Sequence, residues 1–213
     1  MSDDTDTSTL ILIRHGLSAW NSENRFTGWV DTPLSEAGIE EAKKAAMRLT
    51  DVGIQVDQAF TSSLQRAIDT GRIVLDGLGQ PDLEQVQAWQ LNERFYGALT
   101  GRNKEQTAQE FGAEQVHVWR RSYDIPPPGG ESLKDTAARV LPYFDEVVRP
   151  AAVDGRVVLV SAHGNSLRAI VKELDQISDD EITALEIGTG VPLVYGLRDG
   201  RIVSKEILNQ PEP

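Results

Sequence analysis

The chain has 213 residues and a net charge of −12, with 25% charged and 39% hydrophobic residues. The length fits one large domain, and the acidic balance argues against a general nucleic-acid binder, which needs a broad basic face. No apolar run approaches the ~20 residues that span a bilayer, and no basic segment with an apolar core marks a secretory signal. The absence of cysteine excludes disulfides and thiolate sites. We therefore expect a cytoplasmic protein with no membrane or nucleic-acid partner.

The first half of the chain alternates strand and helix signals. Four consecutive apolar residues after the acidic N-terminus predict a strand buried on both faces. Ser35 is placed to cap a helix, and Gly53 to end it. In order, we expect a disordered acidic tail over 1–9, a strand over 10–13, a loop over 25–33, a helix over 35–53, a strand over 56–61, a helix over 62–78, a short strand over 83–88 and a loop over 91–101.

The second half continues the alternation and ends in a hairpin. Pro142 should kink the helix that Ser132 begins, and Pro150 should end it. Asp199-Gly200 between two apolar runs is a strong hairpin signal. In order, we expect helices over 103–111 and 114–122, a stiff turn over 126–130, the helix from 132, a strand from 157, helices over 166–174 and 179–185, and hairpin strands over 191–198 and 201–207. The fold is therefore predicted to be α/β, with one domain over 10–208 and a short tail over 209–213.

Two of the three histidines share one setting. His15 and His163 each follow a buried strand and precede a glycine, which lets the chain turn tightly. In open α/β sheets, ligands bind at the carboxyl ends of the strands. The repeated pattern therefore favours one functional site that contains both histidines over two unrelated core residues.

The residues around the histidines suit phosphate chemistry. A neutral imidazole is a good nucleophile toward phosphorus, and arginine binds phosphate oxygens bidentately. Arg66 begins a predicted helix, where a cation is unfavourable unless an anion is held there too. A metal site is disfavoured because the sequence offers no third ligand near either histidine. A serine hydrolase is disfavoured because the sequence has no Gly-x-Ser-x-Gly turn. The pattern fits phosphoryl transfer through a phosphohistidine. A second histidine, if protonated, could stabilise the charged transition state, and a carboxylic acid could protonate the leaving oxygen.

Longer motifs surround these residues in a fixed order. They are Arg14-His15-Gly16, Phe26-Thr27-Gly28-Trp29, Thr61-Ser62 with Leu64-Gln65-Arg66-Ala67, Leu91-Asn92-Glu93-Arg94 with Tyr96-Gly97, Trp119-Arg120-Arg121, Ala162 to Ala169, and Thr189 to Tyr195. Together they resemble the cofactor-dependent phosphoglycerate mutases of the histidine phosphatase superfamily. The resemblance implies three layers, with a mostly parallel central sheet, helices on both faces and a late antiparallel hairpin. It also implies glycolytic and gluconeogenic interconversion of 3-phosphoglycerate and 2-phosphoglycerate, primed by 2,3-bisphosphoglycerate without metal.

The resemblance assigns roles to individual residues. His15 would be the phosphorylated nucleophile, Glu93 the general acid and base, and His163 the group that stabilises the transferring phosphoryl group. Arg14 and Arg66 would clamp the phosphoryl oxygens. Substrate would be held by Arg14, Ser18, Asn21, Thr27, Gly28, Arg66, Glu93, Tyr96, Lys104, Arg120, Arg121, Gly164 and Asn165.

The sequence departs from the family pattern in three places. Leu17 stands where the family usually has glutamate, which alters the charge beside the nucleophile. The turn over 126–130 replaces a longer segment. The chain stops at Pro213, and a shorter cover over the site would admit water and raise hydrolysis.

Two other functions stay open at this stage. One is a phosphatase of the same superfamily that acts on small phosphorylated metabolites, and the other is a non-catalytic phospholigand-binding module. Lys104, Arg120 and Arg121 favour the mutase, because a general phosphatase has less need to hold a distant carboxylate. The sequence also leaves open a homo-oligomer.

Overall fold

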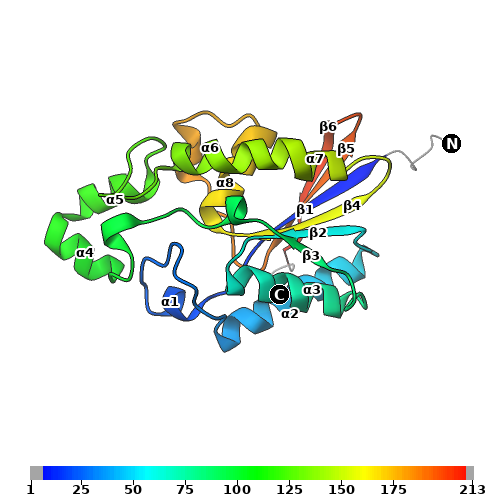
Figure 1. Ribbon diagram of the computed structural model, residues 1–213, viewed down its shortest axis with the longest axis horizontal. Helices are drawn as coiled ribbons and strands as arrows, with labels where there is room; N and C mark the ends of the chain where they lie inside the picture. Colours follow the sequence, from blue (N-terminus) through cyan, green and yellow to red (C-terminus); the bar gives the residue numbers. More distant parts are fainter. Residues whose placement is uncertain (1–6, 210–213) are drawn as a thin grey trace.

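The computed structural model describes residues 7–209, which surround a six-stranded sheet in the order β3-β2-β4-β1-β5-β6. Strands β3, β2, β4 and β1 are parallel, whereas β5 is antiparallel to β1, and β6 to β5. This confirms the mostly parallel sheet with a late hairpin (Figure 1). The strands are β1 (Ser8–Arg14), β2 (Gln58–Thr61), β3 (Gln85–Gln87), β4 (Val157–Ala162), β5 (Pro192–Arg198) and β6 (Arg201–Ile207).

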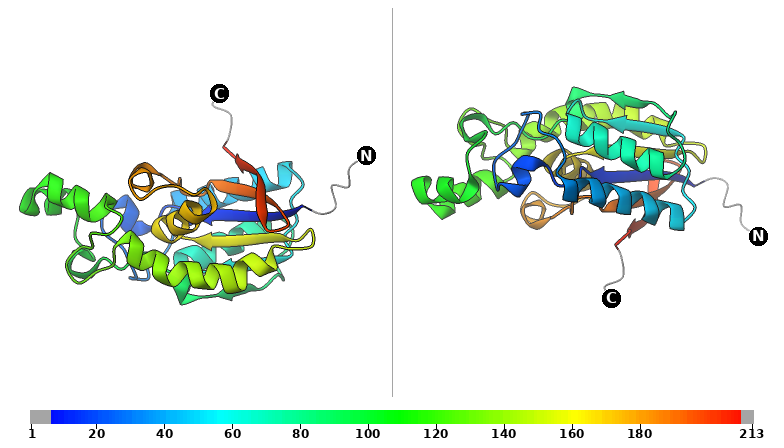
Figure 2. Two further views of the ribbon diagram at one scale, coloured as in Figure 1. Left: turned by 90° about the horizontal axis from the view of Figure 1, so that it is seen from above. Right: turned by 90° about the horizontal axis from the view of Figure 1, so that it is seen from below.

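Helices cover both faces of the sheet, as Figure 2 shows from two sides. Helices α2 and α3 pack together below the sheet in the view of Figure 1, and α6 and α8 pack together above it. The three-layer prediction is therefore confirmed. The helices are α1 (Ala19–Ser22), α2 (Glu36–Asp51), α3 (Gln65–Gly77), α4 (Lys104–Phe111), α5 (Ala113–Arg121), α6 (Leu133–Tyr143), α7 (Arg149–Ala151) and α8 (Gly164–Leu174). No helix within residues 7–209 is long and apolar enough to cross a membrane.

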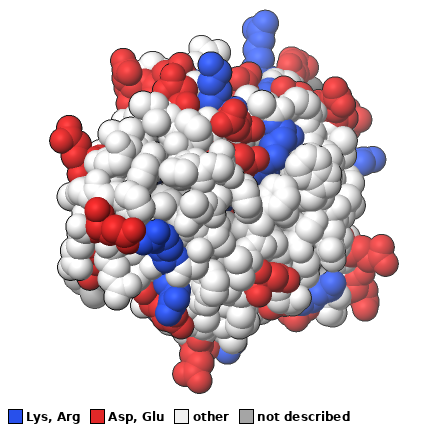
Figure 3. Space-filling view, turned by 60° about the vertical axis from the view of Figure 1, so that its left-hand side comes forward, with Lys and Arg blue, Asp and Glu red and all other residues white. Residues whose placement is uncertain are grey.

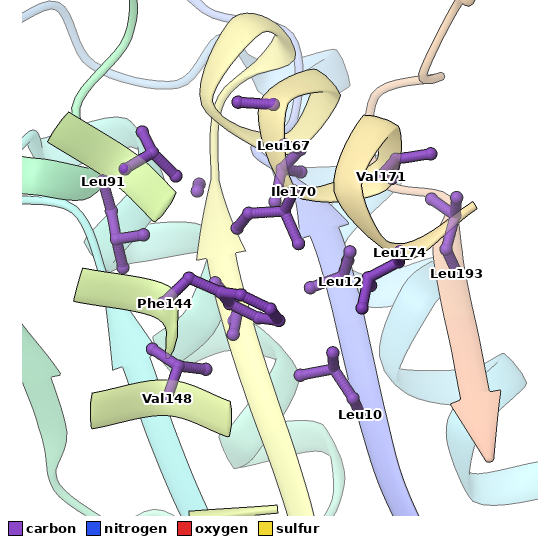
Figure 4. Packing of buried hydrophobic residues seen from close by; sticks show 14 of the residues in the cluster. Leu10, Leu12, Leu91, Phe144, Val148, Leu167, Ile170, Val171, Leu174 and Leu193 are labelled. Atoms are coloured by element: carbon purple, nitrogen blue, oxygen red, sulfur yellow. The ribbon is translucent and has the colours of Figure 1, made fainter. Parts of the chain in front are cut away.

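Strand β1 lies between two hydrophobic cores. Leu10 and Leu12 face the cluster beneath α6 and α8, whereas Ile11 and Ile13 face the cluster beneath α2 and α3. Alternate side chains of a strand point to opposite faces, so all four are at most 1% exposed. Burial of each contributes roughly 1.5–3 kcal/mol. The strand thus holds its carboxyl end rigidly. Figure 4 shows the first cluster, labelled at Leu10, Leu12, Leu91, Phe144, Val148, Leu167, Ile170, Val171, Leu174 and Leu193.

Several predicted boundaries change. Strand β1 begins at Ser8, so residues 8 and 9 belong to the sheet and not to a disordered tail; residues 1–6 and 210–213 lie outside the described part. Helix α8 begins at Gly164, two residues earlier than predicted. The predicted helix over 179–185 is a 3₁₀ turn at Glu181–Ala184.

Pro150 does not end the helix, contrary to the prediction. Helix α6 contains Pro142 and continues through a π turn at Phe144–Val148 into α7, which ends one residue beyond Pro150. Pro150 has no N–H, and its ring crowds the carbonyl four residues earlier. In the widened turn, the Arg149 N–H instead bonds to the Phe144 carbonyl, five residues back. The helix therefore accommodates Pro150 without ending there.

Helices α4 and α5 project past the carboxyl ends of the parallel strands (Figure 1). Asn103 caps α4 by accepting hydrogen bonds from two backbone N–H groups. Gly112, with φ of 88°, separates α4 from α5. The two helices thus stand over the sheet edge at which both histidines emerge.

Candidate active site

His15 and His163 meet at the carboxyl ends of neighbouring parallel strands. His15 follows β1 and His163 follows β4, and the centroids of their rings are 4.9 Å apart. The His15 N–H donates to the Ala162 carbonyl at 2.9 Å, which extends the strand pairing into the site. Both side chains are at most 3% exposed. The prediction that both histidines lie at one sheet edge is confirmed.

The hydrogen bonds of His15 define its reactive nitrogen. Nδ1 lies 2.7 Å from the Gly16 carbonyl oxygen, which can only accept, so Nδ1 carries the proton. Nε2 therefore has the free electron pair, and the Arg66 Nε–H donates to it at 3.3 Å. Burial lowers the pKa of His15 well below its usual value, and the charges of Arg66 and Arg14 lower it further. The ring is thus neutral at pH 7, with an electron pair available on Nε2.

Gly16 is required by close packing. A Cβ on Gly16 would lie 2.2 Å from the Gly38 carbonyl oxygen of α2. Backbone atoms would have to move to relieve this clash. Its backbone is not in the left-handed region, so a tight turn is not the reason, contrary to the sequence interpretation. The contact fixes the position of His15 against α2.

Arg66 is held rigidly beside His15. It lies in the first turn of α3, and its two terminal nitrogens donate to the carbonyls of Gly28 at 2.7 Å and Val30 at 2.9 Å. Burial lowers its pKa to about 10, against the opposing effect of Glu93 and Asp31, so the guanidinium stays charged at neutral pH. Its Nε–H is therefore directed at the atom that would carry a phosphoryl group.

Glu93 is anchored through one carboxylate oxygen. Its Oε1 accepts hydrogen bonds from the N–H of Arg94 at 2.7 Å, from the N–H of Asn165 at 3.2 Å and from Nδ2 of Asn165 at 2.8 Å. Asn165 lies in the first turn of α8, where the helix dipole favours an anion. Oε2 is left for a ligand. A Cβ on Gly164 would lie 3.6 Å from Oε2 and 3.5 Å from Arg14 Nε, so this glycine keeps the space between them open.

His163 is neutral in the free site, so the condition that it be protonated is not met before a ligand binds. Burial lowers its pKa well below the usual value, and the charge of Arg66 and the neighbouring His15 add to the effect. Its Nε2 lies 2.7 Å from Ser62 Oγ, and Nδ1 has no hydrogen-bond partner within residues 7–209. Ser62, which the sequence analysis did not assign to the site, thereby orients the ring. A bound phosphate would supply the negative charge that raises this pKa.

A cleft of about 120 Å³ opens between this edge and α5. Of the predicted site residues, Arg14, His15, Asn21, Thr27, Gly28, Arg66, Glu93, Tyr96, Lys104, Arg120, Arg121, Gly164 and Asn165 line it. His163 does not line it, but its ring centroid lies 4.9 Å from that of His15. Five residues that were not predicted as site residues also line it: Arg25, Phe26, Arg168, Glu186 and Ile187. Within residues 7–209, no group of three or more His, Asp or Glu side chains is arranged to hold a metal ion.

Ser18 and Leu17 do not line the cleft. Ser18 is fully buried and caps α1, where its Oγ accepts from the Asn21 N–H and donates to Asn21 Oδ1. It therefore orients Asn21, which does line the cleft, instead of contacting a ligand there. The Leu17 N–H donates to a carboxylate oxygen of Glu41 at 2.8 Å, so α2 supplies a negative charge near this position.

The cleft concentrates positive charge in an acidic protein. Its wall contains seven lysine and arginine residues and two glutamates, although the chain carries a net charge of −12. Figure 3, which brings the α4–α5 end forward, shows acidic side chains spread around the outline of this face of the molecule. Arg14 Nε and Thr27 Oγ1 are buried without a hydrogen-bond partner within residues 7–209. A low-dielectric cleft of this kind attracts a ligand with more than one anionic group.

Lys104 stands among other cations in this wall. Burial lowers its pKa to about 8, and the charges of Arg120 and Arg14 contribute in the same direction. Its Nζ lies 5.9 Å from the centroid of the Phe26 ring. A ligand anion would favour the charged form of this amine.

Comparison of sequences places the chain among known proteins. The family model described as histidine phosphatase superfamily (branch 1) matches residues 10–209. A 2,3-bisphosphoglycerate-dependent phosphoglycerate mutase of Parvibaculum lavamentivorans is 53% identical over 204 residues, which cover 95% of this chain and 97% of that protein. A phosphoglycerate mutase of Schizosaccharomyces pombe is 51% identical over 210 residues, which cover 98% of this chain and all of that protein.

Solved structures share the fold at lower identity. A phosphoglycerate mutase from Bacillus anthracis superposes with a TM-score of 0.74 at 26% identity, covering 94% of this chain and 92% of that one. A mycobacterial glucosyl-3-phosphoglycerate phosphatase superposes with a TM-score of 0.79 at 27% identity, covering 94% and 97%. The fold thus hosts both transfer to a substrate and hydrolysis, and residues in the cleft must decide between them.

Proposed function

Because the chain belongs to the histidine phosphatase superfamily, we propose that its cleft interconverts 3-phosphoglycerate and 2-phosphoglycerate by phosphoryl transfer through His15, primed by 2,3-bisphosphoglycerate. The observation that carries the proposal is the unprotonated Nε2 of His15, held by Arg66 at one end of a cleft whose other end is lined by Lys104, Arg120 and Arg121. The identity of more than 50% to phosphoglycerate mutases supports the same assignment.

The two ends of the cleft orient the substrate. Arg14 and Arg66 bind the transferring phosphoryl group at His15, because Arg66 directs its Nε–H at Nε2 and Arg14 lines the same cleft with a buried Nε that has no partner within residues 7–209. Lys104, Arg120 and Arg121 bind the carboxylate at the far end. This separation places the substrate hydroxyl near Glu93 Oε2.

The transfer step uses Glu93 as base and then as acid. Glu93 takes the proton of the substrate hydroxyl while that oxygen bonds to phosphorus and the bond from phosphorus to His15 Nε2 breaks. After the doubly phosphorylated product turns over in the cleft, Nε2 attacks its other phosphorus. Glu93 then returns the proton to the departing oxygen. His163, in the tautomer with Nδ1–H, donates to the phosphoryl oxygens as charge develops.

The cleft fits 2,3-bisphosphoglycerate as the priming group. The buried Arg14 Nε and Thr27 Oγ1 have no partner within residues 7–209 and are suited to one phosphate, and the three distal cations to the other anionic groups. When bound, this group supplies the phosphoryl group that charges His15. We place this activity in the cytoplasm, where glycolytic intermediates are present.

The experiment follows 3-phosphoglycerate in EDTA, with and without added 2,3-bisphosphoglycerate, by ³¹P NMR. The proposal predicts 2-phosphoglycerate that depends on the added bisphosphate, with little inorganic phosphate. Arg121→Ala should loosen the distal group and raise the ratio of hydrolysis to transfer. Release of inorganic phosphate without 2-phosphoglycerate, unchanged by Arg121→Ala, would favour a phosphatase of the same superfamily, the activity named for some structural neighbours.

A further inference from the structure

Glu186 is one of two carboxylates in the wall of the cationic cleft. It lies in the irregular segment between the 3₁₀ turn Glu181–Ala184 and β5, and it forms an ion pair with Arg121 at the end of α5. The pair therefore joins two elements that are far apart in the chain and face each other across the cleft.

The two carboxylates differ in how firmly they are held. Glu93 is 8% exposed, and three N–H donors fix its Oε1. The Glu186 side chain is 66% exposed, and its only hydrogen bond within residues 7–209 is the one from Arg121. Glu186 can therefore swing into solvent at little cost, whereas Glu93 cannot.

Glu186 also lies close to a second cation. Arg168 is 5% exposed, donates to Asn165 Oδ1, and has no carboxylate partner within residues 7–209. Glu186 is among the groups whose charge acts on Arg168, and Arg121 and Arg94 are the neighbours that repel it. In the free site, Glu186 thus pairs with Arg121 and adds a negative charge near Arg168.

We propose that Glu186 is a resident counter-ion for Arg121, which the distal anionic group of the ligand must displace. The inference rests on the proposed function for the identity of that ligand. When the ligand carboxylate takes Arg121, the Glu186 carboxylate moves into water, so one ion pair replaces another. Glu186 thereby weakens binding of ligands that carry a second negative charge far from His15, and leaves binding of a lone phosphate at His15 unaffected.

The expected effect is set by the worth of an exposed ion pair. Such pairs change an equilibrium constant by roughly 1.5- to 5-fold at 25 °C. Removal of the Glu186 charge should therefore lower the dissociation constant of 3-phosphoglycerate by that factor. The effect should shrink at high salt, because the Debye length falls to about 3 Å at 1 M.

The experiment is calorimetric titration of wild type and Glu186→Gln with 3-phosphoglycerate and, separately, with inorganic phosphate, without bisphosphate. We expect tighter binding of 3-phosphoglycerate only. Glu206→Gln, which removes an equal charge from exposed strand β6, should match wild type. In the Arg121→Ala background, Glu186→Gln should give no gain.

Three results would overturn the inference. Weaker binding of 3-phosphoglycerate by Glu186→Gln would mean that Glu186 orients Arg121 for the ligand. An equal gain for inorganic phosphate, or a gain that survives Arg121→Ala, would mean a general charge effect. The outcome is separable from the proposed function, because the titration measures binding. Absence of 2-phosphoglycerate in the turnover assay would contradict the proposed mutase activity. The dissociation constants of wild type and Glu186→Gln could still be compared in that case.

Discussion

Lys104 should make substrate affinity depend on pH. Its amine is at the distal end of the cleft, and burial with the charges of Arg120 and Arg14 lowers its pKa to about 8. The substrate carboxylate favours the charged amine. The affinity for the substrate is therefore highest below pH 8 and decreases as the pH rises through 8.

The magnitude follows from the fraction of protonated amine. With a pKa of about 8, roughly nine-tenths of Lys104 is charged at pH 7 and one-tenth at pH 9. If only the charged form binds, KM for 3-phosphoglycerate should rise about 10-fold between these values. Bound substrate keeps the amine protonated, so kcat should change much less than kcat/KM over the same range.

The assay is a kcat/KM profile from pH 6 to 9.5 for wild type and Lys104→Arg. Arginine keeps the charge at this position throughout the range, so the decline near pH 8 should disappear. A profile that declines near pH 8 equally in Lys104→Arg would show that another group titrates, and it would refute this reasoning.

Three further predictions test other parts of the site. Glu93→Gln should lower kcat by about 10²-fold or more with near-normal substrate affinity by calorimetry, and near-full activity would remove Glu93 from the mechanism. The native pKa values of His15 and His163 are lowered, so the unfolded chain takes up protons first as the pH falls. Stability should thus decline below about pH 6.5 by up to about 1.4 kcal/mol per pH unit for each histidine. Urea unfolding should show a shallower decline when both are Asn. Gly97→Ala should destabilise more than Gly53→Ala: both have positive φ, but only the first places its Cβ within 2.3 Å of a backbone oxygen.

The position of the site was predictable from sequence because parallel strands share an edge. The apolar run before His15 and the one before His163 both form central strands, so the two histidines had to emerge together. The starts of helices were equally predictable where a polar residue caps the first turn, as at Ser35 and Ser132.

Other features of the site depend on tertiary contacts that carry no local signal. A serine before a helix serves equally as a cap or as a ligand contact, and only the folded chain shows that Ser18 is buried beneath Asn21. Glu186 reaches the cleft because the segment before β5 passes the end of α5, and Arg168 reaches it from α8. The neutral state of His163 results from burial next to Arg66, which lies about a hundred residues away in the chain.

Identification of the phosphorylated atom tests the central claim most directly. Nδ1 of His15 is hydrogen-bonded to the Gly16 carbonyl, so we expect the phosphoryl group on Nε2. Incubation with 2,3-bisphosphoglycerate, followed by heteronuclear NMR of the labelled protein, should show an acid-labile phosphohistidine at His15 Nε2 that is absent from His15→Asn. A phosphoryl group on Nδ1, on another residue, or retained in His15→Asn with normal turnover would contradict the account.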